Sequence, residues 1–533
     1  MGRKYQLSTL GCKVNQYESQ QLRELLESLG FSPAGPGETP DLAVVNTCAV
    51  TGGACRKSRQ IVRQAARQGG TPVFVVGCSA SADADRLQRV KGVTATLGHE
   101  RNVRAELRQR IRELFDKSPT YTGVSTNEAV EGPRERPAAT GNDEWMSPIV
   151  PLRTPFALLD STTSFATAIL SGPAANVKPA DADIGRIERF DGHHRAFLKV
   201  QDGCDAHCTY CIIPRLRPRL ASKPLAEAVS EAEHLVRSGH REIVLTGIFL
   251  GAYGHPTAIR RRQQPGATPL ARLVDALAGV PGLCRLRLSS LEPGDVDDAL
   301  LDALARHPAC VPHLHLPLQS GSGAILRRMN RQYSVEEFLE MVERVRRTLA
   351  RPAITTDIIV GFPGETEADF ERTLEVARLA GFLKIHAFPF SPREKTAAAR
   401  WRDLFVPPTL VRERMERLAT LEQETSLSFR RQAIGAIERV LVEVVEDDAK
   451  PLFAGAASTV TSRSLRNQPR RVCHGRSDRY FEVYFDDPDA QPNDVVAVRV
   501  DRATPARTHG TLVGRLKAGT GSEAGRPRAA VGT

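Results

Sequence analysis

The amino-terminal part of the chain alternates short apolar runs with amphipathic segments. The strand-like runs are 5–12, 42–50 and 72–78, and the helical segments between them are 21–30 and 59–68. Alternation of strands with helices predicts a parallel sheet joined by crossover helices. We therefore expect an open parallel α/β domain over 1–121.

A second series of strand-like runs fills the middle of the chain. The six runs are 195–200, 242–248, 285–291, 313–318, 354–360 and 383–390. Helical segments separate them, for example at 224–239 and 335–350. Six β/α repeats predict a partial (β/α)6 barrel over 186–431, with its active site at the carboxyl ends of the strands.

The pattern changes near Gln432, where short alternating strands replace the β/α repeat. These runs are 439–447, 479–487, 494–501 and 510–516. They predict a small antiparallel β-barrel over 432–516. A basic loop region is expected in it, with the cations Arg463, Arg466, Arg470, Arg471, Arg476 and Arg479. Small barrels with cationic loops commonly bind RNA, and a solvated charged surface is the alternative.

Two stretches of the chain lack periodicity. Residues 122–185 are rich in Pro, Ala, Gly, Ser and Thr and predict a linker or insertion, in which 152–170 could form a short helix or strand. Residues 517–533 predict a disordered tail. The fold class is thus α/β with a small carboxy-terminal β-barrel.

Charge and cysteine content add candidate chemistry to this organisation. The formal net charge is +11, which favours nucleic acid over an acidic protein as partner. Replacement of Lys by Arg in a GC-rich genome would explain the Arg content but not the sign of the charge. No signal peptide and no apolar run of about 20 residues is found, so we expect a soluble cytoplasmic protein without membrane contact. In that reducing compartment the ten cysteines are more often metal ligands, catalytic thiols or core residues than disulfides.

Three cysteines follow three strands of the predicted amino-terminal sheet. Cys12, Cys48 and Cys78 each stand at a strand's end. Because the carboxyl ends of strands form the ligand crevice of an open α/β sheet, we expect the three thiols to converge on a metal site. The alternative is that they are three independent core cysteines.

The most specific motif is the CxxxCxxC loop directly after the first barrel strand. Cys204, Cys208 and Cys211 supply three thiolates to a cluster of four irons, whereas an ordinary electron-transfer cluster takes four cysteines. An open iron is expected to bind S-adenosylmethionine, from which an electron of the cluster generates an adenosyl radical. The alternative is a zinc site of the three cysteines with His207.

At this point the motifs carry a resemblance to a known family. The segments LGCKVNQYES, VVNTCAVT, VVGCSA, RAFLKVQDGCDAHCTYCIIP, HLHLPLQSGS and TDIIVGFPGET are similar, in this order, to motifs of the radical S-adenosylmethionine methylthiotransferases. The resemblance implies two [4Fe-4S] clusters. Cys12, Cys48 and Cys78 would hold the auxiliary cluster that handles sulfur, and Cys204, Cys208 and Cys211 the radical-generating one. The carboxy-terminal barrel resembles the TRAM domain, an RNA-binding module.

The first motif also resembles one branch of that family. Gly11-Cys12-Lys13-Val14-Asn15 is similar to enzymes that modify threonylcarbamoyladenosine beside the anticodon of tRNA. The isopentenyladenosine branch typically has Gly-Cys-Gln-Met-Asn there, and the ribosomal-protein branch Gly-Cys-Pro-Lys-Asn. The chain departs from family patterns at Arg215, Pro218 and Phe249, and by a basic insertion at 255–267. These departures concern substrate contacts and not the radical chemistry.

Several polar residues lie at or near predicted strand exits, where they could hold the polar parts of S-adenosylmethionine. The candidates for this role are Glu292, Gln319 and Asp357. Gly361 and Gly364 would let the backbone approach a ligand closely, and Tyr210, between two cluster ligands, could pack against the cofactor. A hydrogen bond that merely orders a loop is the alternative for each. Cys55, Cys284, Cys310 and Cys473 lack partners at ligand spacing and are interpreted as structural. We expect only one of His313 and His315 to face the barrel, and neither to be a metal ligand.

Together these features predict a methylthiotransferase that abstracts the hydrogen at carbon 2 of an adenine in tRNA and adds sulfur and a methyl group there, as the resemblance implies. The carbon–hydrogen bond is unactivated, so no ordinary acid or base could remove its proton at neutral pH. Expected partners are the tRNA anticodon stem-loop and an electron donor such as flavodoxin or ferredoxin. The alternatives are action on isopentenyladenosine or on a ribosomal protein, and a noncatalytic metal-cluster protein that binds RNA.

Overall fold

The structure is a computed structural model that describes residues 2–67, 69–115, 184–263, 266, 268–447 and 471–516. Contacts define two compact units, residues 1–109 with 180–533 and residues 110–179. The second unit is described only at the end of helix α5 (Val103–Phe115). The predicted linker at 122–185, its segment 152–170 and the tail at 517–533 lie outside the described residues, apart from Ile184 and Gly185.

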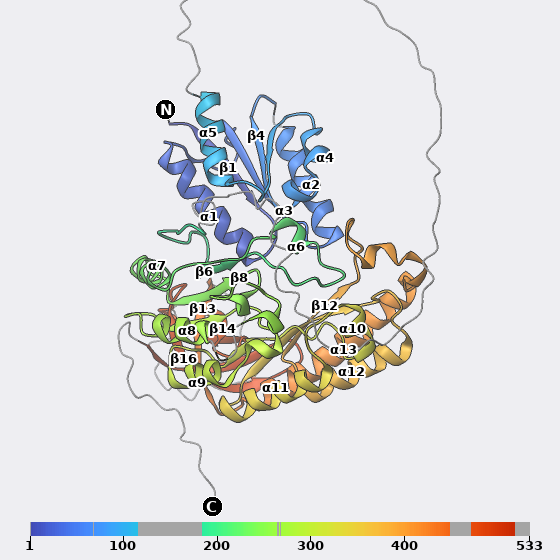
Figure 1. Cartoon of the computed structure of the whole chain (residues 1–533). Helices are drawn as coiled ribbons and strands as arrows, with labels where there is room; N and C mark the ends of the chain where they lie inside the picture. The colour runs from blue at the N-terminus through green and yellow to red at the C-terminus, as the bar shows by residue number, and fades with distance from the viewer. Residues whose placement is uncertain are drawn as a thin grey trace, which may run out of the picture. The chain divides into compact units, whose positions relative to one another are not determined.

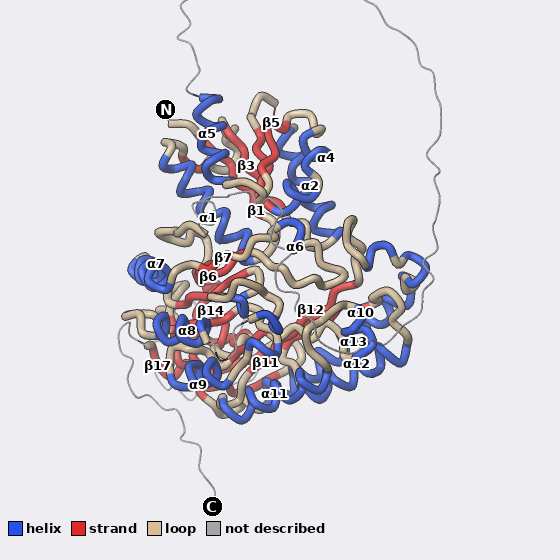
Figure 2. Tube along the Cα trace, viewed as in Figure 1, coloured by secondary structure: helices blue, strands red, loops and turns tan. Residues whose placement is uncertain are grey.

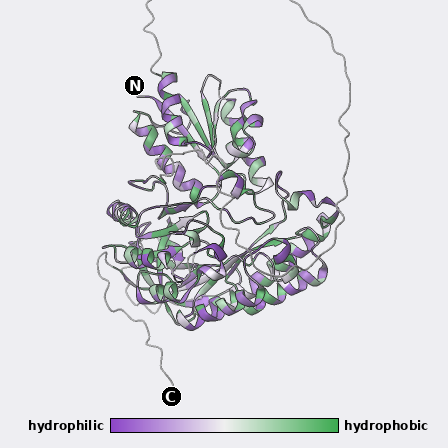
Figure 3. Cartoon of the chain, viewed as in Figure 1, coloured by the Kyte–Doolittle hydropathy of each residue, from purple (hydrophilic) through white to green (hydrophobic). Residues whose placement is uncertain are grey.

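The first unit begins with a five-stranded parallel sheet (Figure 1). Its strands are β1 (Lys4–Thr9), β2 (Ser32–Pro33), β3 (Leu42–Thr47), β4 (Val73–Gly77) and β5 (Val93–Leu97), in the order β2-β1-β3-β4-β5. Its helices are α1 (Lys13–Ser28), α2 (Gly52–Ala66), α3 (Cys78–Ala82), α4 (Ala84–Gln88) and α5. Every residue of β3 and β4 is buried, because parallel strands carry helices on both faces. Figure 3 shows these strands as predominantly hydrophobic. The predicted open parallel α/β fold is confirmed.

The middle of the chain forms the expected six parallel strands (Figure 2). They are β6 (Arg195–Asp202), β8 (Glu242–Gly247), β9 (Arg285–Leu288), β10 (His313–His315), β11 (Ala353–Val360) and β12 (Lys384–Pro389), with the short antiparallel β7 (Ala221–Ser222) beside β6. The sheets β7-β6-β8-β9 and β10-β11-β12 are linked by isolated parallel bridges, Leu286 to Cys310 and Ser290 to His315. Among the described strands β6 and β12 do not pair, so the barrel stays open on one side.

Amphipathic helices cover the outside of this partial barrel (Figure 1). They are α7 (Leu225–Arg237), α8 (Pro269–Ala278), α9 (Asp298–Arg306), α10 (Gly323–Arg328), α11 (Val335–Thr348), α12 (Glu367–Ala380) and α13 (Pro408–Arg431). The short α6 (Ile213–Leu216) instead lies beside α3 of the amino-terminal part (Figure 1). Short 3-10 helices are η2 (Leu250–Ala252), η3 (Arg260–Arg262), η4 (Pro293–Asp295), η5 (Ala398–Arg400) and η6 (Arg402–Leu404). Capping boxes begin α11 at Ser334 and α12 at Thr366. None of the described helices has the length and apolar character needed to cross a membrane.

The carboxy-terminal strands close into a barrel, as expected. They are β13 (Ile437–Asp447), β14 (Arg471–Ser477), β15 (Glu482–Asp486), β16 (Val495–Ala503) and β17 (Thr508–Arg515). The assignment of Arg471–Ser477 to a basic loop is wrong, because this segment is the strand β14, whose residues alternate toward the barrel core. Of the basic set, Arg463, Arg466 and Arg470 lie outside the described residues. Arg479 binds Glu438 and the carbonyls of Ala350 and Arg351, so it joins the barrel to the middle of the chain.

Buried charges join the small barrel to the amino-terminal ends of the parallel strands. The Arg285 and Arg287 guanidinium groups, 0% and 2% exposed, both pair with Glu242. Both also donate hydrogen bonds to the backbone carbonyl of Ser477 in the small barrel. Although burial raises the pKa of Glu242, the two arginines bring it to about 2. Because these arginines need the carbonyls of the barrel, its removal would leave buried charges unsatisfied.

A second buried network joins the amino-terminal sheet to the parallel strands. Arg217, whose side chain is 3% exposed, donates to Glu18 of α1 at 2.7 and 2.8 Å and to Asp202 of β6 at 2.9 and 3.0 Å. Lys199 of β6 also donates to both carboxylates. Burial raises the pKa of Glu18, but Arg217 and Lys199 hold it well below its usual value. The network is complete only when both parts of the chain are present.

Replacing Arg217 by Met is expected to lower the free energy of unfolding by about 3 kcal/mol. This value is near the lower end of the cost of breaking a buried ion pair, because the side chains of Glu18 and Asp202 are partly exposed. Arg219→Met is the matched control, because Arg219 is exposed and should change stability by less than about 0.5 kcal/mol. Urea denaturation of both variants checks this. Equal stability of the two variants would contradict a structural role for the network.

Candidate functional site

The six cysteines singled out from the sequence line one cavity. Its volume is about 340 Å³, and Cys12, Cys48, Cys78, Cys204, Cys208 and Cys211 all contribute to its wall. The first three come from the amino-terminal sheet and the others from the loop after β6. In the described part of the chain, no group of three or more His, Cys, Asp and Glu side chains forms a site for a single metal ion. The arrangement is therefore one of six thiols around a shared space.

Side-chain hydrogen bonds hold the three amino-terminal cysteine loops together. The Asn15 amide donates to the carbonyls of Leu10 at 2.9 Å and Thr47 at 2.8 Å, which joins the loops after β1 and β3. The hydroxyls of Ser58 and Ser79 donate to the Cys48 carbonyl at 3.1 and 2.7 Å. Because Ser79 is adjacent to Cys78, these bonds fix the second and third loops relative to each other.

Two glycines permit this close approach of the loops. Gly77 has a φ of 89°, and a Cβ there would lie 2.3 Å from the Asn46 side chain and 2.6 Å from the Thr47 carbonyl. Gly11 has a φ of 113°, and a Cβ would lie 2.9 Å from Cys48. Any other residue would carry backbone strain and a clash at both positions.

The loop that bears the other three cysteines is fixed from several sides. The Cys204 amide donates to the Arg217 carbonyl at 3.0 Å, and the Thr209 amide donates to the Met329 carbonyl at 3.0 Å. Asn330 donates to the His207 carbonyl at 2.8 Å. This backbone pairing sets the positions of the three thiols without using their sulfur atoms.

Arg217 also connects the two cysteine sets. Its guanidinium donates to His99 Nε2 at 2.8 Å, and the same nitrogen lies 3.9 Å from Cys78 Sγ. Burial and the adjacent Arg217 lower the pKa of His99 to about 4, so His99 is neutral and accepts this bond. The backbone of Arg217 binds Cys204 while its side chain reaches toward Cys78, so one residue relates both sets.

Arg331 is a site residue that the sequence analysis missed. Its Nη1 lies 3.2 Å from Cys208 Sγ and 3.3 Å from the Tyr210 hydroxyl, and its Nη2 lies 2.5 Å from Glu292 Oε1. Arg331 follows α10, away from any strand exit, and no spacing rule relates it to the cysteines. Only the fold brings its positive charge beside a thiol, where it would stabilise a thiolate.

Burial favours the protonated form of five thiols when no metal is bound, those of Cys48, Cys78, Cys204, Cys208 and Cys211. Burial, with a smaller contribution from neighbouring thiols, raises the pKa of Cys78 and that of Cys211 to about 12. Burial also raises the pKa of Cys204 and Cys48. Metal binding must therefore displace protons, so the positive charge of iron is what would make these groups thiolates.

Four of the five residues expected to bind the cofactor line the same cavity. They are Tyr210, Glu292, Gln319 and Asp357. Gln319 adopts a φ of 61°, a left-handed conformation that is costly for a residue other than glycine. The Tyr210 ring packs edge-on against Phe362 at 6.3 Å.

Gly361 is not among the residues that line this cavity. Its amide donates to Glu365, and a Cβ would lie 2.5 Å from Val411. Packing within the barrel thus accounts for this glycine.

Polar atoms in the cavity wall fit a polar ligand. Ser289 Oγ and Glu292 Oε2 are buried, and neither makes a hydrogen bond within the described chain, although Arg260 Nη2 lies 3.8 Å from Glu292 Oε2. Both residues line the cavity. Since buried polar groups are nearly always paired, these two atoms are suited to a bound molecule. The CxxxCxxC loop contributes three of the six thiols in this cavity wall.

The remaining candidate residues lie elsewhere. His207 is exposed and does not line the six-cysteine cavity. The expectation that only one of His313 and His315 faces the barrel is wrong. Residues two apart on a strand point to the same side, and both rings bond Thr355 Oγ1, at 3.0 and 2.9 Å. The cavity wall does not include Cys55, Cys284, Cys310 or Cys473.

The departures from family motifs have different surroundings. Phe249 lines the cavity, and its amide donates to Gln201 at 2.7 Å. Pro218 is exposed. Arg215 is exposed and lines a neighbouring pocket, described below.

Two family models match this chain. Residues 198–377 match the radical SAM superfamily, and residues 4–98 match the uncharacterized protein family UPF0004. A radical S-adenosylmethionine methyltransferase, TsrM, from Kitasatospora setae has a TM-score of 0.48 and 16% identity, covering 75% of this chain and 77% of that one.

Curated relatives of two kinds span most of the chain. The threonylcarbamoyladenosine tRNA methylthiotransferases MtaB of Chlamydia pneumoniae and Bacillus subtilis are 33% and 30% identical, covering 83% and 95% of this chain and 87% and 95% of theirs. The tRNA-2-methylthio-N(6)-dimethylallyladenosine synthase of Frankia alni is 34% identical, covering 95% of this chain and 87% of that one. Membership of the radical SAM superfamily implies S-adenosylmethionine and a [4Fe-4S] cluster. With its paired cysteine sets, this chain belongs to the radical S-adenosylmethionine methylthiotransferases that modify tRNA.

Proposed function

We propose that this enzyme adds a 2-methylthio group to threonylcarbamoyladenosine beside the anticodon of tRNA. The observation that carries the reaction type is the convergence of two cysteine triplets on one cavity. Cys204, Cys208 and Cys211 hold the radical-generating cluster, and Cys12, Cys48 and Cys78 hold a second [4Fe-4S] cluster. Both groups would border the cavity that receives the base, the first supplying the radical chemistry and the second the sulfur.

Lys13 supports the threonylcarbamoyl substrate. It lines the cavity next to Cys12, and no hydrogen bond or ion pair of its ammonium group is found in the described part of the chain. Burial lowers the pKa of Lys13, whereas the Asp357 carboxylate in the same cavity wall raises it. The threonylcarbamoyl group carries a carboxylate, whereas the dimethylallyl group is a hydrocarbon. A cation in a partly buried site is stabilised by an anionic ligand and is costly beside an apolar one. Lys13 therefore favours the carboxylate-bearing base.

The protein's own side chains bind and orient the reactants. When bound, the cluster and S-adenosylmethionine supply the adenosyl radical that can break an unactivated carbon–hydrogen bond at carbon 2 of adenine. The Ser289 hydroxyl and Glu292 Oε2, which make no hydrogen bond within the described chain, would hold the polar end of the cofactor. Arg331 holds Glu292 in place and faces Cys208. Asp357 is held by His315, at 3.3 Å.

The proposed partners follow from this chemistry. Reduction of the cluster needs a one-electron donor, for which a cytoplasmic flavodoxin or ferredoxin is suited. The carboxy-terminal barrel is proposed to contribute to tRNA binding in the manner of a TRAM domain. Since Arg479 pairs with the buried Glu438, its guanidinium is committed to the fold, and the RNA contacts of the barrel must come from other residues.

Exchange of each cysteine triplet for Ala should separate the two roles. The reconstituted wild type should hold about eight irons, and each triple variant about four, because each triplet ligates one four-iron cluster. The Cys204, Cys208 and Cys211 variant should lose cleavage of S-adenosylmethionine. The Cys12, Cys48 and Cys78 variant should keep cleavage and form no methylthio product. Iron analysis and product chromatography check this; methylthio product at the wild-type rate from the second variant would refute the proposed sulfur role.

Lys13→Gln should weaken action on tRNA that contains threonylcarbamoyladenosine. Loss of a charged hydrogen bond worth about 1.5–3 kcal/mol lowers kcat/KM by about tenfold to a hundredfold. Lys13→Arg is the matched control, because it keeps the positive charge and should retain most of the activity.

In cells, nucleoside mass spectrometry of a deletion strain should show loss of 2-methylthio-threonylcarbamoyladenosine. Loss of the methylthio form of dimethylallyladenosine instead would overturn the proposed substrate.

A further inference from the structure

The open side of the partial barrel lies between its first and last strands. Strand β6 pairs with β7 and β8, and β12 pairs only with β11, so the described sheets leave a seam between β6 and β12. In a closed barrel these two strands would pair with each other. The loop bearing Cys204, Cys208 and Cys211 follows β6, so this loop lies at the seam.

Residues 390–405, which follow β12, cross the seam as a strap. The hydroxyl of Ser391 accepts a hydrogen bond from the Gly52 amide at 2.8 Å, which ties the strap to the amino-terminal sheet. The Ala398 amide donates to the Thr209 carbonyl at 2.9 Å, which ties it to the cysteine loop. The Gly364 amide donates to the Leu404 carbonyl at 2.7 Å. The strap is thus held at three places.

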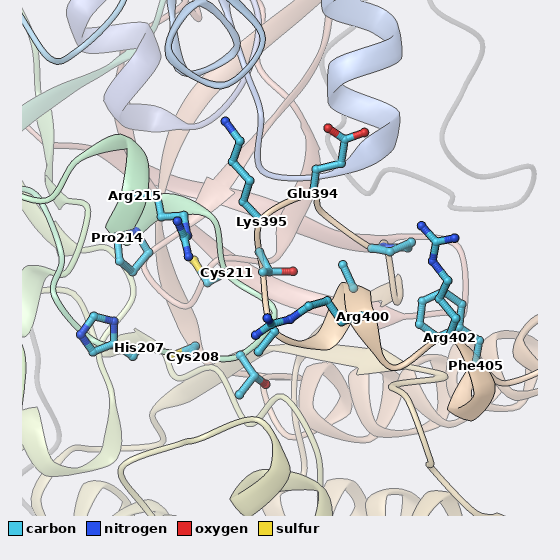
Figure 4. Close-up of a pocket in the computed structure, with 15 residues that line it drawn as sticks. His207, Cys208, Cys211, Pro214, Arg215, Glu394, Lys395, Arg400, Arg402 and Phe405 are labelled. Carbon is cyan, nitrogen blue, oxygen red and sulfur yellow. The ribbon is translucent and has the colours of Figure 1, made fainter. Parts of the chain in front are cut away.

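A pocket of about 820 Å³ lies between the strap and the cysteine loop (Figure 4). Figure 4 shows cationic side chains from both segments, Arg215 from the cysteine loop and Lys395, Arg400 and Arg402 from the strap. Glu394 is the single carboxylate among the described residues that line it. Cys208 and Cys211 form part of the wall, and they also line the six-cysteine cavity. A ligand in this seam pocket is therefore next to the radical centre.

These four cations differ from the arginines that stabilise the fold. Arg217, Arg331 and Arg414 each bind carboxylates in buried networks. The four pocket cations are exposed, and within the described chain none of them makes an ion pair or a side-chain hydrogen bond. Uncompensated positive charges in a concave site raise the local concentration of an anionic ligand.

Two further features favour a nucleic-acid ligand. Phe405 lines the pocket and is 36% exposed, although its ring packs against Phe390 at 5.6 Å. An exposed aromatic ring among cations is the arrangement that binds single-stranded nucleotides, through phosphate contacts and base stacking. Lys395 has a φ of 69°, so the strap holds this cation in a left-handed conformation that costs free energy.

We propose that the seam pocket binds the phosphate groups of nucleotides that flank the modified base in the substrate RNA. The proposal rests on the proposed function, since it requires an RNA whose target base lies in the six-cysteine cavity. With the base in that cavity, the adjoining backbone passes Cys208 and Cys211 into the seam. Lys395, Arg400 and Arg402 then bind phosphates, and Phe405 offers a surface on which a neighbouring base stacks.

An acidic electron carrier is the other anionic partner that could approach this face. Such a protein docks through an open surface of up to about 600 Å² on each side. The four cations instead line a concave pocket from two segments, a shape that admits a strand of RNA. The pocket geometry therefore favours RNA.

The test compares a pocket variant with a matched control of equal charge loss. The pocket variant carries Lys395→Gln, Arg400→Gln and Arg402→Gln. The control carries Arg272→Gln, Arg378→Gln and Arg412→Gln, three exposed arginines on the outer helices α8, α12 and α13 that form no ion pair in the described chain. Binding of a synthetic anticodon stem-loop RNA is measured for both and for the wild type across a KCl series.

The pocket variant should bind the RNA about tenfold more weakly near 0.1 M KCl, and its salt slope should fall by about 2, since three single-strand phosphate contacts contribute about 0.7 each. The control should match the wild type. Equal losses in both variants would show that only net charge matters and would overturn the proposal. Wild-type RNA binding by the pocket variant would also overturn the proposal. If that variant binds RNA normally but is reduced more slowly by a flavodoxin, the pocket is a docking site for the electron carrier.

Two further measurements keep these outcomes interpretable. Circular dichroism melting checks the fold of each variant, and single substitutions at the exposed Lys395, Arg400 or Arg402 replace the triple variant if it melts early. RNA affinity is measured without turnover, so it does not depend on the identity of the methylthio product. A failed substrate assignment would therefore appear in nucleoside analysis, and a failed pocket assignment in the salt series.

Discussion

Arg217 is the residue on which the geometry of the candidate active site depends most. Its guanidinium binds Glu18 of the amino-terminal sheet and Asp202 of the first barrel strand, and its backbone carbonyl accepts from the amide of Cys204. Through His99 it also lies next to Cys78. A planar group with five donors is suited to several acceptors at once, which an ammonium could not match. The spacing of the two cysteine sets is thereby fixed before any cofactor is bound.

Much of the fold could be predicted because the spacing of hydrophobic residues along the chain shows which faces of the strands and helices are buried. Parallel strands buried on both faces, such as β3 and β4, are continuous apolar runs, and the strands of the partial barrel share this character. The convergence of Cys12, Cys48 and Cys78 followed from one rule, that the carboxyl ends of parallel strands meet at one edge. The sequence pattern was less informative for β14 (Arg471–Ser477), because this segment mixes cations with small residues. Its alternation of buried and exposed residues is therefore weak in the sequence, and the segment resembles a loop.

The parts that were missed depend on contacts between distant segments. Arg331 and Arg217 act through charge pairs that no local spacing encodes. Gly361 has a motif position that suggests ligand approach, but its close neighbour is Val411. The cationic seam pocket arises only because the strap after β12 returns to the loop after β6. Sequence reasoning thus singled out six cysteines that share one cavity, and the structure adds the residues that hold and surround them.

The two ends of the partial barrel have different tasks. At the amino-terminal ends of the strands, Arg285 and Arg287 pair with Glu242 and with carbonyls of the small barrel, so this end is closed by buried charge. At the carboxyl ends, Ser289 and Glu292 line the cysteine cavity, and the Ser289 hydroxyl makes no hydrogen bond within the described chain. The charges at the first end thus serve the fold, whereas the cavity lies at the carboxyl ends of the strands, where barrels of this type bind ligands.

The central claim is that the two cysteine triplets hold two clusters that face the same cavity. Electron paramagnetic resonance of the fully reduced protein tests this most directly, because two paramagnetic clusters at such close range broaden each other's signals and speed each other's relaxation. The account predicts a broadened, fast-relaxing spectrum that becomes a simple single-cluster spectrum when Cys12, Cys48 and Cys78 are replaced by Ala. Two independent, uncoupled signals in the wild type, or a spectrum unchanged by that replacement, would contradict it.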